Sequence, residues 1–154
     1  MSRTSLLLLP ILLIAASAQA QNSAAETKAV QLTINTFFEG MKQGDSAKVR
    51  RTLAPGVVFH VIKKQGVKVE LAAENPNEFL KAVGTPHTEA WDERISFEQV
   101  LVDAILASVW TPYQFYLGSK FSHCGYNSFQ LIRMADGWKI AHIIDTRHKE
   151  PCKQ

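Results

Sequence analysis

The stretch that decides the fold runs from Tyr113 to Arg147. It reads Tyr113-Gln114-Phe115-Tyr116, then Ser122-His123-Cys124-Gly125-Tyr126-Asn127-Ser128-Phe129-Gln130-Leu131, and after a turn at Ala135-Asp136-Gly137 it ends Trp138-Lys139-Ile140-Ala141-His142-Ile143-Ile144-Asp145-Thr146-Arg147. Its residues alternate in polarity with no helical period, which predicts long strands joined by a tight turn. It also holds most of the aromatic, histidine and acidic residues that could serve a site.

The residues before this stretch extend the strand pattern. We expect four long antiparallel strands, over Ala90–Leu101, Asp103–Leu117, Lys120–Met134 and Trp138–Arg147. Proline cannot donate to a strand ladder, so Thr111-Pro112 predicts a bulge or a sheet edge.

The N-terminal half reads as helices and one hairpin. Apolar residues at helical spacing predict a helix over Glu26–Gly44. A short helix capped by Asp45 or Ser46 should follow and end at Pro55-Gly56. A hairpin of strands Val57–Ile62 and Val67–Leu71 should follow, with its turn at Gln65-Gly66. A third helix, capped by Asn75, should then run to Gly84.

This order predicts an α+β fold. Helices segregated to one side of an antiparallel sheet give a cone-shaped curved sheet wrapped on the N-terminal helices, a cystatin-like α+β roll. The open mouth of such a cone is where a small-molecule pocket would form.

The first twenty residues read as a secretory signal peptide. Arg3 gives the positive start, Leu6–Ala15 is an apolar run, and Ala18-Gln19-Ala20 is a cleavage signal. A membrane-spanning helix needs about twenty apolar residues. We therefore expect cleavage after Ala20, a short tether over 21–25, one domain over 26–152, and an exported protein that is periplasmic or extracellular with no membrane attachment.

Charge and cysteine content narrow the function classes. The net charge is +3 with no basic stripe, which argues against nucleic-acid binding. The two cysteines, Cys124 and Cys152, lie in an exported chain, so a disulfide between them is expected. The alternative is two separate thiols, with Cys124 buried as a small hydrophobe.

The order of elements and several motifs carry a family resemblance. The motifs are Tyr113-x-Phe115-Tyr116, Phe121-Ser122-His123-Cys124-Gly125, Phe129-Gln130-Leu131, Asp136-Gly137-Trp138-Lys139-Ile140 and Asp145-Thr146-Arg147. Over about residues 26–152 the chain resembles the nuclear transport factor 2-like superfamily, including SnoaL-like cyclases, and within it a bacterial family named lumazine-binding proteins. That superfamily holds enzymes, binding modules and oligomerisation domains, so the resemblance implies the fold more than the activity.

The register of the last hairpin decides which residues meet. A two-residue turn at Asp136-Gly137 would pair Asn127 with Thr146, whereas a three-residue turn with Gly137 in a bulge would pair Asn127 with Asp145. We favour the second, which would bring together His123, Asn127, Asp145 and Arg147.

His123 and Asp145 are the catalytic candidates. A carboxylate that orients an imidazole makes a general base near neutral pH, and Tyr113 or Tyr116 could donate to a developing oxyanion. The alternative is structural: Asp145 pairs with Arg147, and His123 is a wall residue.

The remaining ligand-binding candidates are His60, in a strand with Val58 and Ile62, and the aromatic Trp91. No local spacing suits a metal, and no motif implies a cofactor. The sequence therefore predicts a binder of a small apolar or aromatic molecule and a homodimer. The alternatives are an isomerase, cyclase or hydrolase that uses His123 and Asp145, and a dimerisation module without catalysis.

Overall fold

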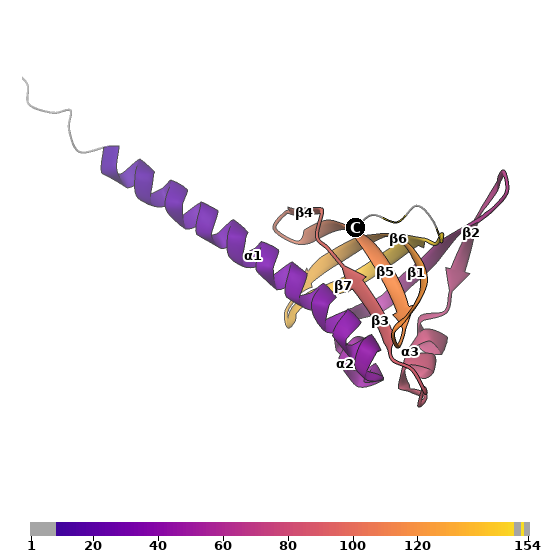
Figure 1. Cartoon of the computed structure of the whole chain (residues 1–154). Coiled ribbons are helices and arrows are strands. Elements are labelled where there is room, and N and C mark those ends of the chain that lie inside the picture. Colours follow the sequence, from indigo (N-terminus) through magenta and orange to yellow (C-terminus); the bar gives the residue numbers. More distant parts are fainter. Residues whose placement is uncertain (1–8, 150–151, 153–154) are drawn as a thin grey trace, which may run out of the picture.

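The structure is a computed structural model that describes residues 9–149 and 152, with side chains from residue 23 onward. Helices precede a strongly curved sheet, and α3 lies beside the first hairpin (Figure 1). The elements in chain order are α1 (Leu9–Gln43), α2 (Ser46–Arg51), β1 (Leu53–Gln65), β2 (Lys68–Glu74), α3 (Pro76–Gly84), β3 (Trp91–Ile95), β4 (Gln99–Val102), β5 (Leu106–Leu117), β6 (Lys120–Met134) and β7 (Gly137–Thr146).

Helix α1 is longer than the predicted Glu26–Gly44 helix, and its N-terminal part extends past the sheet (Figure 1). Its packing on the sheet starts near Glu26, which accepts a hydrogen bond from Trp138 Nε1 at 2.7 Å, and Val30 is fully buried. Residues 1–8 of the predicted signal peptide, and the side chains of its cleavage signal, lie outside the described residues. No helix in the described part of the chain combines the length and hydrophobicity needed to cross a bilayer.

The caps of the two short helices follow the sequence. Asp45 accepts from the Lys48 amide at 2.8 Å at the start of α2, and Asn75 accepts from the Asn77 amide at 2.9 Å at the start of α3. Both bonds satisfy backbone donors that have no partner inside a helix. Pro76 occupies the first position of α3, where its missing N–H costs nothing.

The seven strands form one curved, open sheet in the order β2-β1-β7-β6-β5-β3, with β4 also paired to β5. The α+β prediction is confirmed, but the sheet is mixed rather than wholly antiparallel. Strand β1 runs parallel to β7, with Val61 opposite Asp145. The chain leaves the β1–β2 hairpin through α3, starts again at the far edge with β3, and returns strand by strand until β7 reaches β1.

Two predicted boundaries are wrong because proline interrupts a ladder. The expected strand Ala90–Leu101 divides into β3 and β4, and the break lies opposite Pro112, whose carbonyl accepts from Ser96 N at 3.2 Å. Pro55-Gly56 does not end a helix. It lies inside β1, where the register against β7 shifts between Leu53 and Val58.

The turn between β6 and β7 has two residues, because Met134 pairs with Gly137. That register alone would put Asn127 opposite Ile144. A shift after Leu131–Ile140 leaves Ala141 as an extra residue, so Gln130 pairs with His142 and Asn127 with Asp145. The predicted Asn127–Asp145 pair is confirmed, but a bulge at Ala141 produces it, and not a three-residue turn.

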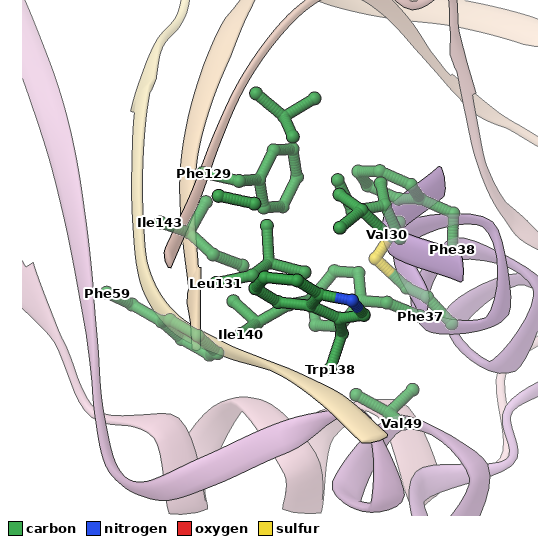
Figure 2. Close-up of a cluster of buried hydrophobic side chains, with 14 of the residues drawn as sticks. Val30, Phe37, Phe38, Val49, Phe59, Phe129, Leu131, Trp138, Ile140 and Ile143 are labelled. Atoms are coloured by element: carbon green, nitrogen blue, oxygen red, sulfur yellow. The ribbon is translucent and has the colours of Figure 1, made fainter. Parts of the chain in front are cut away.

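The hydrophobic core lies between α1 and the concave face of the sheet (Figure 2). Phe37 and Phe38 of α1 point at the strands, where Phe129, Leu131 and Ile140 are fully buried. Helix α1 covers only part of the concave face. The strand ends near Asp145 and Trp91 extend beyond it, which leaves room for a cavity.

Candidate functional site

A cavity of about 560 Å³ opens on the concave face of the sheet. This volume is in the range of sites for small molecules and cofactors. Its wall is mostly aromatic and aliphatic, with a few polar groups from β1, β2, β3, β6 and β7. The lining residues are Phe37, Phe38, Met41, Phe59, His60, Glu74, Phe79, Trp91, Glu93, Tyr113, Phe115, Leu117, His123, Asn127, Phe129, Ile143, Asp145 and Arg147.

The central polar contact of the cavity joins Asn127 to Glu93. The Asn127 side-chain Nδ2 donates to Glu93 Oε1 at 2.8 Å, and Asn127 is itself buried. Glu93 shares a face of β3 with Trp91 and Ile95, so its carboxyl lies among apolar neighbours. Its remaining surface faces the cavity.

Burial changes the protonation of Glu93. Loss of hydration raises the pKa of this carboxyl from 4.5 to about 8; the bond from Asn127 opposes the rise and the charge of Asp145 adds to it. Glu93 is therefore largely a neutral acid at pH 7. In that form it can donate one hydrogen bond to a ligand, and above pH 8 it presents a carboxylate.

Asp145 is paired with Arg147, as the structural alternative to the predicted His123–Asp145 base expects. Arg147 Nε donates to Asp145 Oδ2 at 2.8 Å, and Arg147 Nη2 contacts Glu74 Oε1 at 3.2 Å. No hydrogen bond joins His123 to Asp145 among the described residues. Asp145 and Arg147 are two residues apart, so their side chains point to the same side of the sheet. Asp145 therefore pairs with Arg147 rather than with the imidazole of His123.

Tyr113 crosses the sheet over a glycine. Gly125 lies opposite Tyr113 on β6, and a Cβ there would collide with the Thr146 carbonyl oxygen. The Tyr113 hydroxyl uses this space to donate to Thr146 O at 2.8 Å. The hydroxyl also lies 3.5 Å from Asp145 Oδ2, and both contacts compete with its predicted role as an oxyanion donor. Burial, together with Glu93 and Asp145, also raises the pKa of Tyr113 well above its usual value.

His123 lines the cavity as a neutral wall residue. Burial and the charge of Arg147 lower the pKa of its imidazole, although Asp145 opposes them. Its ring stacks obliquely on Phe115 with centroids 5.0 Å apart, and Nδ1 lies 3.0 Å from Ser122 Oγ. This leaves Nε2 as the ring nitrogen that can contact a ligand.

The other three predicted ligand-binding residues differ in whether they line the cavity. Trp91 lines the cavity and stacks on His87 with centroids 4.4 Å apart. Tyr116 is not among the lining residues, because it lies between the lining residues Phe115 and Leu117 on β5 and so points to the other face, where its hydroxyl donates to Gln114 Oε1 at 2.8 Å. His60 belongs to the cavity wall, but its Nδ1 lies 3.0 Å from His142 Nε2 on the outer face of the sheet.

Cys124 and Cys152 form a disulfide, with Cα atoms 5.8 Å apart. The chain after β7 also pairs with β6 at this point, because the Cys124 and His148 backbones exchange two hydrogen bonds of 2.8 and 2.9 Å. Together these contacts hold the segment that carries Arg147 against the end of the sheet.

Solved structures share this architecture. An NTF2-like protein with a cystatin-like fold from Novosphingobium aromaticivorans superposes with a TM-score of 0.70 at 10% identity, covering 87% of this chain and 89% of that one. An NTF2-like protein of unknown function from Shewanella baltica gives 0.63 at 14% identity, with 82% and 97% covered. A ketosteroid isomerase-like protein from Erwinia carotovora gives 0.59 at 14% identity, with 81% and 98% covered.

The chain has the nuclear transport factor 2-like fold. No protein-family model matches the sequence, and no curated protein matches it. At such identities the superpositions establish the fold of the chain and leave its chemistry to its own residues.

Within this nuclear transport factor 2-like fold, residues 9–149 and 152 contain no group of three or more His, Cys, Asp and Glu side chains that could hold a metal ion. The polar groups of the cavity could orient an organic ligand by hydrogen bonds and charge.

Sequence reasoning missed Glu93 and Glu74. Glu93 could have been found from the sequence, because it is an acid on the strand face that also holds Trp91 and Ile95. A charged residue among apolar ones indicates either that the strand faces are wrongly assigned or that the residue belongs to a functional site. Glu74 carried no such signal, because it shares a strand face with Lys68 and Glu70 and lies beyond the predicted strand Val67–Leu71.

Proposed function

We propose that this protein is an exported binder of a small, largely apolar or aromatic molecule, held in the concave cavity. One observation carries the proposal: a half-buried carboxyl, Glu93, with an amide partner, Asn127, at 2.8 Å, lines an otherwise largely apolar and aromatic cavity of about 560 Å³. A cavity of this kind combines apolar burial with one directional contact, which is how small-molecule sites gain affinity and orientation.

Ligand binding can be tested with the mature chain and a panel of aromatic heterocycles. The panel should include a lumazine, because the sequence resembles the lumazine-binding family. Leu117→Trp adds bulk at the cavity wall, whereas Leu101→Trp adds the same bulk at a position that is 65% exposed outside it. Binding by the wild type and Leu101→Trp, with loss in Leu117→Trp, supports the proposal. Equal binding by both variants contradicts it.

Export can be tested separately from binding. The intact mass of protein recovered from the periplasm or medium should correspond to cleavage after Ala20. Recovery of the uncleaved chain in the cytoplasm would contradict the exported part of the proposal.

A second candidate function is acid–base catalysis, with Glu93 in place of the predicted pair His123 and Asp145. The supporting observation is that the pKa of Glu93 is raised to about 8, near the pH at which a catalytic acid or base works best. Isomerisation, cyclisation or hydrolysis of a bound ligand would then need Glu93 while binding would not. Glu93→Gln should abolish turnover and keep binding, whereas Asp145→Asn, which breaks the Arg147 pair, should weaken both.

We also propose a homodimer through the outer face of the sheet. The strand register places four exposed apolar side chains on this face: Val58, Leu106, Trp110 and Ile132. Trp110 is stacked on Tyr126 with centroids 5.2 Å apart, which makes a flat surface. Light scattering should give twice the monomer mass for the wild type and the monomer mass for Trp110→Lys.

A further inference from the structure

Acidic groups outnumber basic ones around the cavity. Glu74, Glu93 and Asp145 line it, against the single guanidinium of Arg147. That guanidinium contacts two of the three acids, Asp145 at 2.8 Å and Glu74 at 3.2 Å. The cluster of Asp145, Arg147 and Glu74 therefore carries a net charge of −1 when all three are ionised, and Glu93 adds a second negative charge when it loses its proton.

The rest of the wall suits a cation as well. Eight aromatic side chains line the cavity: Phe37, Phe38, Phe59, Phe79, Trp91, Tyr113, Phe115 and Phe129. The face of an aromatic ring is negative, so it attracts an ammonium group that has lost its water. An aromatic wall with an excess of carboxylates is the arrangement that recognises alkylammonium ions.

The same groups are unfavourable for an anion. The Tyr113 hydroxyl donates to Thr146 O, and two nitrogens of Arg147 are bound by carboxylates. His123 is held neutral, because burial and Arg147 lower its pKa. A carboxylate or phosphate ligand would meet Glu74 and Asp145 with no free cation to balance it.

We propose that the ligand of this cavity is an organic cation, an amine or a quaternary ammonium with an apolar or aromatic body, whose charged group lies against Glu93. The inference rests on the proposed ligand-binding function and names its chemical class. Asn127 holds Glu93 Oε1, which leaves Oε2 for the cation.

Binding of a permanent cation should release a proton from Glu93. The neutral acid becomes a carboxylate beside the ligand, and its proton goes to the solvent, so the charge of the complex balances. Burial keeps the pKa of free Glu93 at about 8, so this release should occur at neutral pH. The other titratable or charged groups that face the cavity are Glu74 on β2, His60 on β1, Tyr113 on β5, His123 on β6, Asp145 on β7 and Arg147 just after β7. Lys42 of α1 pairs with Asp92 at 3.0 Å.

Three probes of one shape test the charge preference: phenyltrimethylammonium, its uncharged isostere tert-butylbenzene, and the anion 4-tert-butylbenzoate. Affinities would be measured by titration calorimetry and by changes in the NMR signals of the Trp91 indole. At pH 8.5 we expect the cation to bind roughly ten- to thirtyfold tighter than the uncharged isostere. We expect the anion to bind most weakly.

The pH dependence and two variants complete the test. From pH 6.5 to 8.5 the affinity for the cation should rise about tenfold, because Glu93 no longer has to release a proton. The uncharged isostere should show no such rise. Glu93→Gln should remove both the preference and the pH dependence, whereas exposed Glu70→Gln should keep both.

The outcomes separate the inference from the proposed function. Equal or tighter binding of tert-butylbenzene overturns the cation inference and leaves the ligand-binding function standing. Binding of the cation that persists in Leu117→Trp places it outside the cavity and also overturns the inference. If none of the three probes binds, and the aromatic panel also fails, the ligand-binding function itself is overturned.

Discussion

Asn127 on β6 donates to Glu93 on β3 across 2.8 Å, and the bond passes over the intervening strand β5. The two strands are not neighbours, so their side chains meet only because the sheet curves. This contact holds the cavity carboxyl whose pKa is raised to about 8.

Glu93→Gln should alter how stability depends on pH. The folded chain holds the Glu93 proton up to a pKa of about 8, whereas the unfolded chain releases it near 4.5. Between these values the free energy of unfolding of the wild type should fall by up to about 1.4 kcal/mol per pH unit, and glutamine cannot contribute to this fall.

Urea denaturation at pH 5, 7 and 9 measures this difference. The variant should be close to the wild type at pH 5 and more stable at pH 9. Exposed Glu70→Gln is the matched control and should follow the wild-type curve. Parallel curves for the wild type and Glu93→Gln would show that Glu93 is hydrated.

Asp145 and Arg147 should be energetically coupled. Their bond of 2.8 Å is partly shielded from solvent, so a double-mutant cycle with Asp145→Asn and Arg147→Gln should give about 1 to 2 kcal/mol. A second cycle with Asp145→Asn and His123→Asn should give less than about 0.5 kcal/mol. A larger value in the second cycle would favour the predicted His123–Asp145 pair.

Gly125→Ala should destabilise the protein by about 2 to 4 kcal/mol. The new methyl group would overlap the Thr146 carbonyl and press on the Tyr113 ring, and both belong to the packed wall of the cavity. Gly66→Asn is the control, because that glycine has a φ of 60° and nothing within 4 Å, and asparagine tolerates such a conformation. Thermal denaturation should show a small shift for Gly66→Asn and a large one for Gly125→Ala.

Cys152→Ser should cost about 3 to 4 kcal/mol, the entropy expected for opening a loop closed by cysteines 28 residues apart. The comparison is denaturation with and without a reductant. Reduction should weaken the wild type by a similar amount and leave Cys152→Ser unchanged. A wild type that is insensitive to reduction would mean that the backbone pairing of Cys124 and His148 alone holds this segment.

Much of the fold could be predicted because the local sequence patterns agree with the tertiary structure. The caps at Asp45 and Asn75, the bounds Lys120–Met134 of β6, and the α+β class all follow from local patterns. The parallel pairing of β1 with β7 could not be predicted, since alternation shows that a strand has two faces and gives no partner or direction.

The site was predictable in its members more than in its contacts. Tyr113, His123, Asn127, Asp145 and Arg147 all line the cavity, and they come from the three neighbouring strands β5, β6 and β7 and the residue after β7. Which of them pair depends on the direction of each side chain, and the sequence does not contain that direction. The Asn127–Asp145 pairing was predicted for an incorrect reason, because a bulge at Ala141 has the same effect as a longer turn.

The bulge at Ala141 determines which side chains of β7 face the cavity. If Ala141 paired with Gln130 and made no bulge, the two-residue turn would place Ile144 opposite Asn127, and β7 would present His142 and Ile144 to the cavity. The acidic wall would then point outward and the outer histidine inward. The chemistry of the binding site therefore depends on a bulge at a residue that lines no part of it, and deleting Ala141 would remove the bulge while leaving Asp145 opposite Asn127.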